Sequence, residues 1–494
     1  MPSLFKRTEV YPKTWQLLLL GLIFLSVGQH PIPVLDEESY WKIAAEMSWS
    51  RPYDWKMPWS PFEEQGFVYA HPPLFLYWVK LVQSFAGLSL AQWILGIPFQ
   101  ALFLFSVHQL YQKFLKPQNY WYAMVLLFLS AGVYLPMTRS LMPDLMVLSI
   151  GTFALWKWFS AEKSTQYLFS GLLLGTAAWV KYPALILFLL PLFSRKKGDF
   201  GWFLLGGAGI FCLGESWLWS MYGEVHFLEV LRRAPEIPRS SFGARGIGMV
   251  NRLGISLFPL SLLLLIQMKK NAWIIGGIGG LCSLLYAYHL GIEHRFLAFP
   301  FGFLGGVLLS SFRFNSIWSF WAMLVLLAVL IGHNYASPRY WVLIAFPLLL
   351  QEVKDIQLER RHWLITFPAA MVSFFLARTE FLQARAAAQL AEEIQHMTSA
   401  GAFTGEWTFR WKMEQLGYSF MADQQPKMVI WARNSAGGVD ALEYTLFERK
   451  EGAEGLFSLV NFEHSVGYYA ETLGYFPFWI GTEPLEVVEI WKKK

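Results

Sequence analysis

The sequence predicts a polytopic α-helical membrane protein, with about thirteen transmembrane helices and a C-terminal α/β domain on the outer face. Three observations support this fold class. The 494 residues are 55% hydrophobic and only 15% charged, and their mean hydropathy is +0.36. Soluble domains carry roughly a quarter charged residues. Apolar stretches recur along residues 14–378, and Lys or Arg marks every second loop between them.

A transmembrane helix needs about 20 apolar residues at a rise of about 1.5 Å each. The first stretch follows Lys6, Arg7 and Lys13, and no small-residue cleavage site comes after it, so we interpret it as a retained helix. The predicted spans are 14–30, 91–112, 119–137, 143–160, 166–181, 182–194, 199–220, 253–268, 271–291, 295–312, 315–333, 339–351 and 362–378. The shortest are 182–194 and 339–351, which is why the count is approximate.

Loop charges predict the orientation of these spans. With a cytoplasmic N-terminus, the cytoplasmic loops are 111–119, 157–165, 194–199, 268–271, 311–315 and 351–362, and each contains Lys or Arg. Residues 31–90, 221–252 and everything after 379 then face outward. Counting 71–87 as a span would reverse every later loop, so we expect an interfacial helix there, opened by Pro72 and Pro73.

The chain divides into a membrane module, 1–379, which includes the outer loop 31–90, and an outer domain, 380–494. The outer domain shows a helical run at 384–395 and β-like stretches at 427–434 and 485–491. The net charge of +5 comes from residues in short loops, which argues against a nucleic-acid partner. Cys212 and Cys282 lie in apolar stretches, without disulfide or metal-binding spacing.

Three neighbouring carboxylates, Asp36, Glu37 and Glu38, follow the first apolar run in "VLDEESYW" (34–41). Acidic triplets are commonly solvated loops, but this one opens an amphipathic stretch, 40–47, beside the membrane. Other polar groups on the predicted outer face could converge with it: His71, Arg139, Asp144, Lys181, Arg295 and Arg339. Each alone fits a snorkelling or helix-end residue. Together they indicate a membrane-surface site for an anionic substrate.

Five motifs occur in a fixed order: "DEESY" (36–40), "HPPL" (71–74), "TRSLMPD" (138–144), "GLLLGTAAWVKYPAL" (171–185) and "SPRY" (337–340). In this order they resemble the polyprenyl-phosphate-dependent glycosyltransferases of the GT-C fold. The group in question contains the protein O-mannosyltransferases and the aminoarabinose transferase that modifies lipid A. The resemblance covers roughly 14–350, and "TGEWTFRWKMEQLGY" (404–418) also looks like an outer-domain segment of bacterial members.

The resemblance implies inverting transfer of a sugar from a polyprenyl-phosphate donor to a lipid, glycan or protein acceptor at the cytoplasmic (inner) membrane. Asp36 matches the family's general base, and Glu37 the acid that orients the acceptor or a divalent metal. A positioned carboxylate contributes about 10²–10⁴-fold, and cations stabilise the leaving phosphate. The expected phosphate-binding residues are Lys181 and Arg339 foremost, then Arg139 and Arg295. The expected substrate-binding residues are His71, Asp144, Tyr40 and Tyr340.

One departure from the family concerns the start of the interfacial helix. The aminoarabinose transferases look like Glu-Lys-Pro-Pro there, whereas this chain has Ala70, His71, Pro72 and Pro73. This puts in doubt a metal-ligand glutamate and lipid A as acceptor, and leaves His71 as a metal or phosphate ligand. Two alternatives to an enzyme are a transporter or flippase of lipid-linked sugars and a scaffold subunit. We find no internal repeat, and the charged residues cluster at helix ends, which argues against a transporter.

Overall fold

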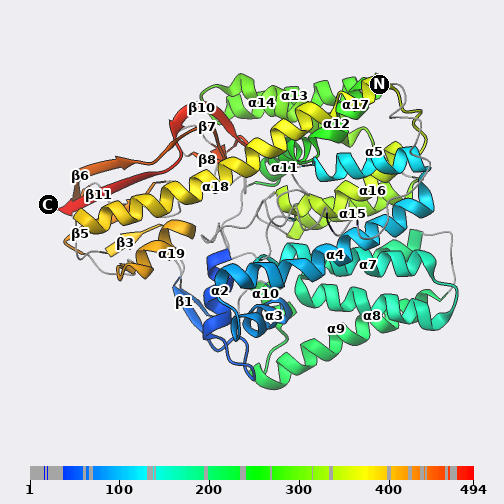
Figure 1. Cartoon of the computed structure of the whole chain (residues 1–494), viewed down its shortest axis with the longest axis horizontal. Coiled ribbons are helices and arrows are strands. Elements are labelled where there is room, and N and C mark those ends of the chain that lie inside the picture. The colour runs from blue at the N-terminus through cyan, green and yellow to red at the C-terminus, as the bar shows by residue number, and fades with distance from the viewer. Residues whose placement is uncertain are drawn as a thin grey trace.

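The computed structural model describes residues 16, 19, 37–58, 63–65, 71–130, 137, 141–193, 199–233, 241–267, 270–313, 315–332, 338–397, 402–405, 407–420, 426–433, 439, 442–461, 466–467 and 475–494. They form a bundle of long helices with a smaller strand-containing part beside it, in which the C-terminus lies (Figure 1). One long helix, α18, belongs to both parts.

Helices make up most of the described chain. The α-helices are α2 (Glu37–Glu46), α3 (Leu74–Gln83), α4 (Leu88–Phe114), α5 (Pro117–Phe128), α7 (Pro143–Ser160), α8 (Ser164–Val180), α9 (Phe200–Tyr222), α10 (His226–Arg233), α11 (Phe242–Ser256), α12 (Phe258–Ile266), α13 (Lys270–His289), α14 (Ala298–Leu309), α15 (Ile317–Gly332), α16 (Val342–Val353), α17 (Arg360–Trp363), α18 (Thr366–Met397) and α19 (Trp407–Gln415). The part of the chain that the structure describes also contains the 3₁₀-helices η2 (Tyr182–Phe193), η4 (Arg295–Leu297) and η5 (Pro338–Trp341).

The strands are short. They are β1 (Lys56–Pro58), β2 (Glu63–Gln65), β3 (Ala402–Thr404), β4 (Ser419–Phe420), β5 (Met428–Ala432), β6 (Tyr444–Glu451), β7 (Glu454–Ser458), β8 (Val460–Asn461), β9 (Val466–Gly467), β10 (Trp479–Pro484) and β11 (Val487–Lys493). The hairpin β1–β2 lies in the first predicted outer loop, between α2 and α3.

The predicted spans from 91–112 onward overlap these helical elements, although 131–136 of the predicted span 119–137 lie outside the described residues. The first predicted span, 14–30, lies almost entirely outside the described residues. Among the described residues, three helices are long and apolar enough to cross a membrane singly: α4, α13 and the continuous segment Arg360–Met397. The pair α11 and α12 makes a fourth if its two halves are one span. Many apolar side chains along the bundle are exposed, as a lipid-facing surface requires.

Two predicted spans differ in shape from the expected straight α-helix, and both contain proline. Within the predicted span 182–194, Tyr182–Phe193 form the 3₁₀-helix η2, which starts beside Pro183 and contains Pro191. At about 2.0 Å per residue, twelve residues of 3₁₀-helix extend about 24 Å, further than an α-helix of the same length. The predicted span 253–268 begins earlier, at α11, and bends by 80° into α12, where Pro259 cannot donate to the preceding turn.

Contacts between loops show which helix ends lie together. Lys113 Nζ donates to the Phe159 carbonyl (2.9 Å), and Asn119 Nδ2 donates to the Val353 carbonyl (2.7 Å). These contacts join the loops 111–119, 157–165 and 351–362 at one end of the bundle. Ser164 adds the loop at 194–199 by donating to Asp199 Oδ2 (2.8 Å).

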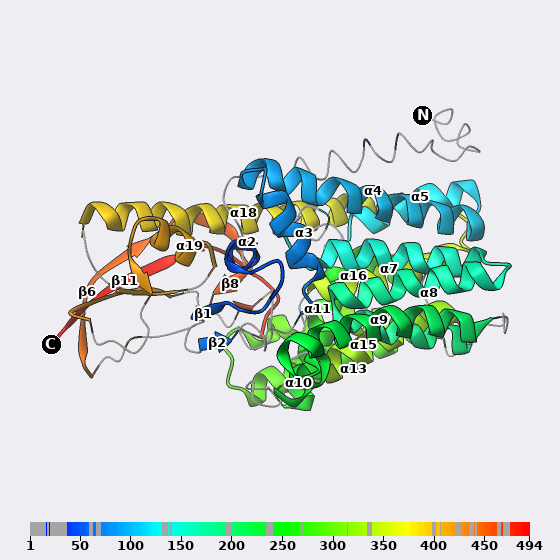
Figure 2. The ribbon, with the colours of Figure 1, turned by 90° about the horizontal axis from the view of Figure 1, so that it is seen from below.

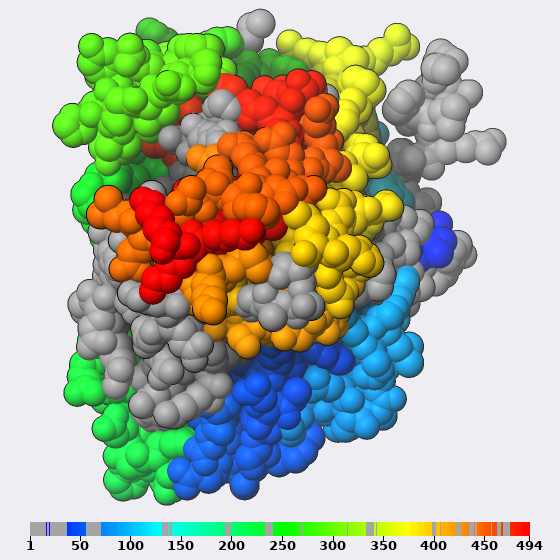
Figure 3. Space-filling model, turned by 90° about the vertical axis from the view of Figure 1, so that its left-hand side faces the viewer, coloured from blue at the N-terminus to red at the C-terminus, as the bar shows by residue number. Residues whose placement is uncertain are grey.

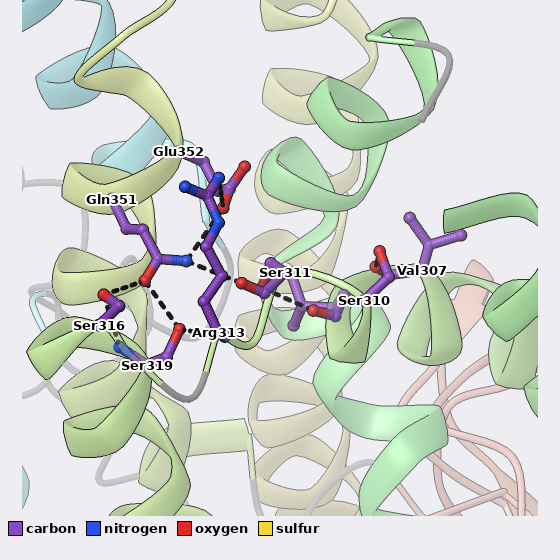
Figure 4. Close-up of polar contacts among 9 residues, drawn as sticks. Val307, Ser310, Ser311, Arg313, Ser316, Ser319, Gln351 and Glu352 are labelled. Atoms are coloured by element: carbon purple, nitrogen blue, oxygen red, sulfur yellow. Dashed lines mark hydrogen bonds and ion pairs between the residues drawn. The ribbon is translucent and has the colours of Figure 1, made fainter. Parts of the chain in front are cut away.

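A polar cluster adds a fifth loop to the same end (Figure 4). Arg313, in the loop 311–315, pairs with Glu352 (2.9 Å), while Gln351 donates to the Ser311 carbonyl (2.7 Å) and accepts from Ser319 (2.7 Å). Five of the six loops predicted to be cytoplasmic therefore meet at one end, which we call the loop end. The opposite helix ends, where Asp144, Lys181, Tyr222 and Tyr340 lie, form the site end.

The C-terminal part is the α/β domain that the sequence predicts. Its sheet has the strand order β4-β3-β5-β11-β6, in which β3 is parallel to β4 and β5, and β11 is antiparallel to β5 and β6. The stretches predicted at 427–434 and 485–491 are β5 and β11, with Ile490 opposite Ile430. The C-terminal half of α18 and α19 pack on this sheet, burying Leu390, Ile394 and Met413.

No break separates the two parts at the predicted boundary of 379/380, because α18 runs through it (Figure 2). The C-terminal strands also return to the membrane module. Phe476 and Phe478 bury against Phe301 of α14, and the fully buried Arg252 of α11 donates to the Gly467 carbonyl (3.0 Å). The domain is therefore fixed on the bundle by more than its connecting helix.

Candidate active site

A buried ion pair lies at the site end. Lys181 Nζ donates to Asp144 Oδ1 at 2.8 Å, and both residues are at least 96% buried, with exposed fractions of 3% and 4%. The sequence predicted both as site residues from separate motifs. The structure places them together.

Local sequence explains why these two residues meet. Asp144 follows Pro143 in the first turn of α7, where proline fits and a carboxylate complements the helix dipole. Lys181 caps the C-terminus of α8, where a cation is favourable, and Pro183 prevents the α-helix from continuing. Because α7 and α8 are neighbours joined by a short loop, the start of one lies beside the end of the other.

Tyr340, the third predicted residue, completes the group. Lys181 Nζ lies 4.6 Å from the centroid of the Tyr340 ring, within the range of a cation–π contact. A cavity of about 30 Å³ adjoins all three side chains, and aliphatic residues form the rest of its wall: Val147, Pro183, Ala184, Val325, Ala328, Val329 and Leu343. That volume holds about two water molecules, far less than a sugar phosphate.

The remaining predicted cations are placed differently. Arg339 belongs to η5 next to Tyr340, but its side chain lies outside the described residues, as does all of Arg139. Arg295 is exposed, and its guanidinium lies over the Tyr288 ring at 4.5 Å. The described contacts therefore join Lys181 to Asp144 and Tyr340, and not to Arg295.

His71 and Tyr40 pair with each other across the first outer loop. Their rings are nearly parallel, with centroids 6.5 Å apart, and the Tyr53 hydroxyl donates to the His71 carbonyl (2.7 Å). Burial raises the pKa of Tyr53 well above its usual value, so this hydroxyl keeps its proton. Tyr53 in turn stacks on His226, with centroids 4.6 Å apart.

His226 connects this loop to the ion pair through residues that the sequence reasoning missed. The Tyr182 hydroxyl contacts His226 Nδ1 and donates to Glu215 Oε1 at 2.8 Å. Tyr182 directly follows Lys181 in the chain, so these contacts connect Tyr40 to the residue next to the ion pair. A signal was present in the sequence: Glu215 is an acid inside an apolar stretch, where ionisable residues are commonly functional.

The helix at the acidic triplet begins earlier than the predicted amphipathic stretch 40–47. Helix α2 begins at Glu37, so Glu37 and Glu38 do not alternate across an extended chain, and both are 2% exposed. Glu38 Oε2 pairs with Lys42 Nζ at 2.9 Å. Burial raises the pKa of Glu38, and the Lys42 ammonium opposes that rise. Asp36 lies outside the described residues, one position before α2.

The predicted metal site rests on Glu37 and His71. Among the described residues, no three His, Cys, Asp or Glu side chains gather closely enough to hold a metal ion. Glu37 and His71 therefore remain candidates through the family resemblance alone, and we assign no chemical step to a metal.

Comparison with known proteins gives similarity of shape only. No family model matches the chain, and no curated protein does. Two solved structures of ArnT from Cupriavidus metallidurans are similar to it. The structure bound to undecaprenyl phosphate has 12% identity and a TM-score of 0.45, over 85% of this chain and 93% of that chain. The apo structure has 13% identity and a TM-score of 0.42, over 85% and 92%. Because both scores lie below 0.5, the proposal below rests on this chain's own residues.

Proposed function

We propose that this chain is a membrane glycosyltransferase that moves a sugar from a polyprenyl-phosphate donor to an acceptor on the outer face of the cytoplasmic membrane. The observation that carries the proposal is the buried Lys181–Asp144 pair beside Tyr340. It lies at the helix ends opposite the basic loops, which is where a lipid-anchored anionic headgroup would be met.

Burying an ammonium ion is costly, and Asp144 offsets that cost while the donor is absent. A lysine carries three N–H donors, so pairing with one carboxylate leaves it able to bind phosphate oxygens as well. Asp144 thus holds the lysine in place, and the phosphate supplies further negative charge. In this proposal Arg339 and Arg139 add the cations that a neutral Lys181–Asp144 pair lacks.

The reaction is a single displacement. Asp36 takes the proton of an acceptor hydroxyl or amine, the acceptor atom forms a bond to the anomeric carbon, and the bond from that carbon to the phosphate oxygen breaks. The bonding electrons leave on the phosphate, giving polyprenyl phosphate and a glycosylated acceptor with inverted configuration. Lys181 and its neighbouring cations stabilise the charge that develops on the leaving oxygen.

The first outer loop supplies the acceptor side of the site. Tyr40 and His71 stack there, and the contacts through Tyr53, His226 and Tyr182 connect that loop to Lys181. The cavity beside the ion pair is too small for the donor headgroup. We therefore propose that donor binding displaces part of its lining.

The test is donor turnover by the purified full-length protein in detergent or nanodiscs. Labelled polyprenyl-phosphate sugars, one pentose and several hexoses, are supplied with a total envelope extract as acceptor, and release of polyprenyl phosphate is measured. We expect release with at least one donor, and release slower by about 10²–10⁴-fold from an Asp36→Asn variant. Movement of intact donor across proteoliposomes without release would favour a flippase and overturn the proposal.

Donor sugar and acceptor are best identified in cells. Cell-envelope glycans of a deletion strain are compared with those of the same strain carrying the wild-type or the Asp36→Asn chain. A sugar modification restored only by the wild-type chain would name both substrates. An unchanged glycan profile in the deletion strain would contradict a transferase.

A further inference from the structure

Four charged side chains connect the acidic loop to the C-terminal domain. Glu38 and Lys42 of α2 pair at 2.9 Å, Lys42 also contacts Glu414 of α19, and Arg410 Nε donates to Glu414 Oε1 at 3.0 Å. The signs alternate along this chain of contacts, which we call the α2–α19 charge chain. Helices α2 and α19 lie side by side in both ribbon views (Figures 1 and 2).

The two ends of the charge chain are buried, and its middle is not. The side chains of Glu38 and Arg410 are 1% and 2% exposed, whereas those of Lys42 and Glu414 are 23% and 29% exposed. Arg410 is further fixed over the Phe420 ring, 4.2 Å from its centroid. A buried charge that loses its partner is costly, so α2 cannot rotate or slide along α19 without a penalty.

Helix α2 depends on such contacts because ten residues are too few for a stable isolated helix. On its other side, α2 is held by α3: Lys80 donates to the Ala44 carbonyl in the last turn (3.0 Å), and Gln83 donates to the Trp41 carbonyl in the middle of the helix (3.2 Å). The space-filling view shows the blue N-terminal residues directly against the yellow and orange C-terminal ones (Figure 3). The membrane module thus holds one side of α2 and the C-terminal domain the other.

We propose that Glu414 is a positioning residue: through Lys42, the C-terminal domain fixes the N-terminal end of α2 and so the place of Glu37, the first residue of that helix. This inference rests on the proposed function, because Asp36 and Glu37 are its acids. It assigns the C-terminal domain a part in the chemistry that is separate from any acceptor selection.

The test compares wild type, Glu414→Gln, Lys42→Gln and the double variant. We measure kcat, donor KM, donor Kd and the hydrogen exchange of residues 37–46. We expect Glu414→Gln to lower kcat by about 10–100-fold, since misplacement by about 1 Å can cost that much, with donor Kd within about 2-fold of wild type. Exchange in 37–46 should quicken. Because both residues act through one contact, the double variant should be no slower than the slower single variant.

A neighbouring ion pair on the same helix provides the control. Lys412 pairs with Glu392 of α18 at 2.5 Å and is not part of the charge chain. Lys412→Gln should keep wild-type kcat and exchange. An equal loss in this variant, or wild-type kcat and α2 exchange in Glu414→Gln, would overturn the proposal.

Failure of the proposed function is distinguishable from failure of this inference. A wild-type protein that transfers no sugar refutes the transferase. The hydrogen exchange of α2 then tests separately whether Glu414 holds this helix in place. Quicker exchange in Glu414→Gln supports the positioning role, and unchanged exchange overturns it.

Discussion

The buried Lys181–Asp144 pair follows from the preferences of helix ends together with the packing of α7 against α8. An ammonium at a helix C-terminus and a carboxylate at a neighbouring helix N-terminus are each locally favourable, and antiparallel packing makes them one pair. Removing only the lysine would leave a buried carboxylate without its ammonium, at a cost of about 3–5 kcal/mol. Removing both charges separates the role in binding from the role in folding.

We therefore predict that Lys181→Met/Asp144→Asn folds and loses donor affinity, whereas Lys181→Met alone also loses stability. A lost charge-assisted contact of about 1.5–3 kcal/mol weakens donor Kd by roughly 10–150-fold. Donor binding by calorimetry and thermal unfolding are the two measurements. Lys157→Met is the matched control, because Lys157 lies at the far end of α7 over the Trp156 ring. Normal donor affinity in the double variant would place the phosphate elsewhere.

The carboxylates of the acidic triplet allow a second prediction, because Asp36 and Glu38 have different expected roles. Asp36→Asn keeps the shape of the side chain but cannot accept a proton, so we expect donor binding to persist and transfer to fall by about 10²–10⁴-fold. Sequence reasoning alone expects Glu38→Gln to cost much less. Glu38 is buried and paired with Lys42 in the structure. We therefore expect Glu38→Gln to slow sugar transfer and to quicken the hydrogen exchange of α2. Normal transfer by Asp36→Asn would shift the base role to Glu37.

Motif order predicted Lys181, Asp144 and Tyr340 because each carries a polar group at the end of an apolar run. It could not predict Tyr53, Tyr182 or His226. Aromatic residues near helix ends are common in membrane proteins, and only the tertiary contacts show that these three connect the outer loop to the position next to Lys181.

The positions of the helices along the chain were predicted more reliably than the shapes of those helices. Apolar length identifies a span, but it does not distinguish the 3₁₀-helix η2 from an α-helix or reveal the 80° bend between α11 and α12. Prolines mark both places, yet a proline is also tolerated inside α4 at position 98. Local sequence therefore locates an irregularity without fixing its shape.

Helix α10 is capped at its N-terminal end by a carboxylate from α9. Glu215 of α9 accepts the Phe227 backbone N–H at 3.0 Å, in the first turn of α10, and also the Tyr182 hydroxyl. Glu215→Ala leaves the Phe227 N–H without this acceptor, at about 1–3 kcal/mol for an unsatisfied group, and leaves the Tyr182 hydroxyl with His226. We expect quicker hydrogen exchange across 226–233 and a lower Tm. Glu224→Ala, at an exposed acid just before α10, should change neither, and equal effects of the two variants would contradict the capping role.

The helix bundle has a loop end and a site end, and the loop charges predicted which loops lie together at the loop end. Five loops grouped as cytoplasmic by their Lys and Arg content meet at the loop end, although nothing in the grouping required them to touch. An error of one span would have placed later loops at the opposite end. The number thirteen remains a prediction, since length and composition support three or four single spans among the described residues.

We predict that the loop end faces the cytoplasm, and accessibility to a membrane-impermeant maleimide tests this orientation. Cys212 and Cys282 are exposed on the bundle, so both are first replaced by Ser. Single cysteines then replace Glu162 and Lys354 at the loop end, and Gln415 on α19, all of which are exposed. Positive loops are retained inside, so we expect label at Gln415 in intact cells and at the other two only after permeabilisation. Label at Glu162 and Lys354 in intact cells would invert the orientation. Label at only one of those two would contradict the shared loop end that their contacts define.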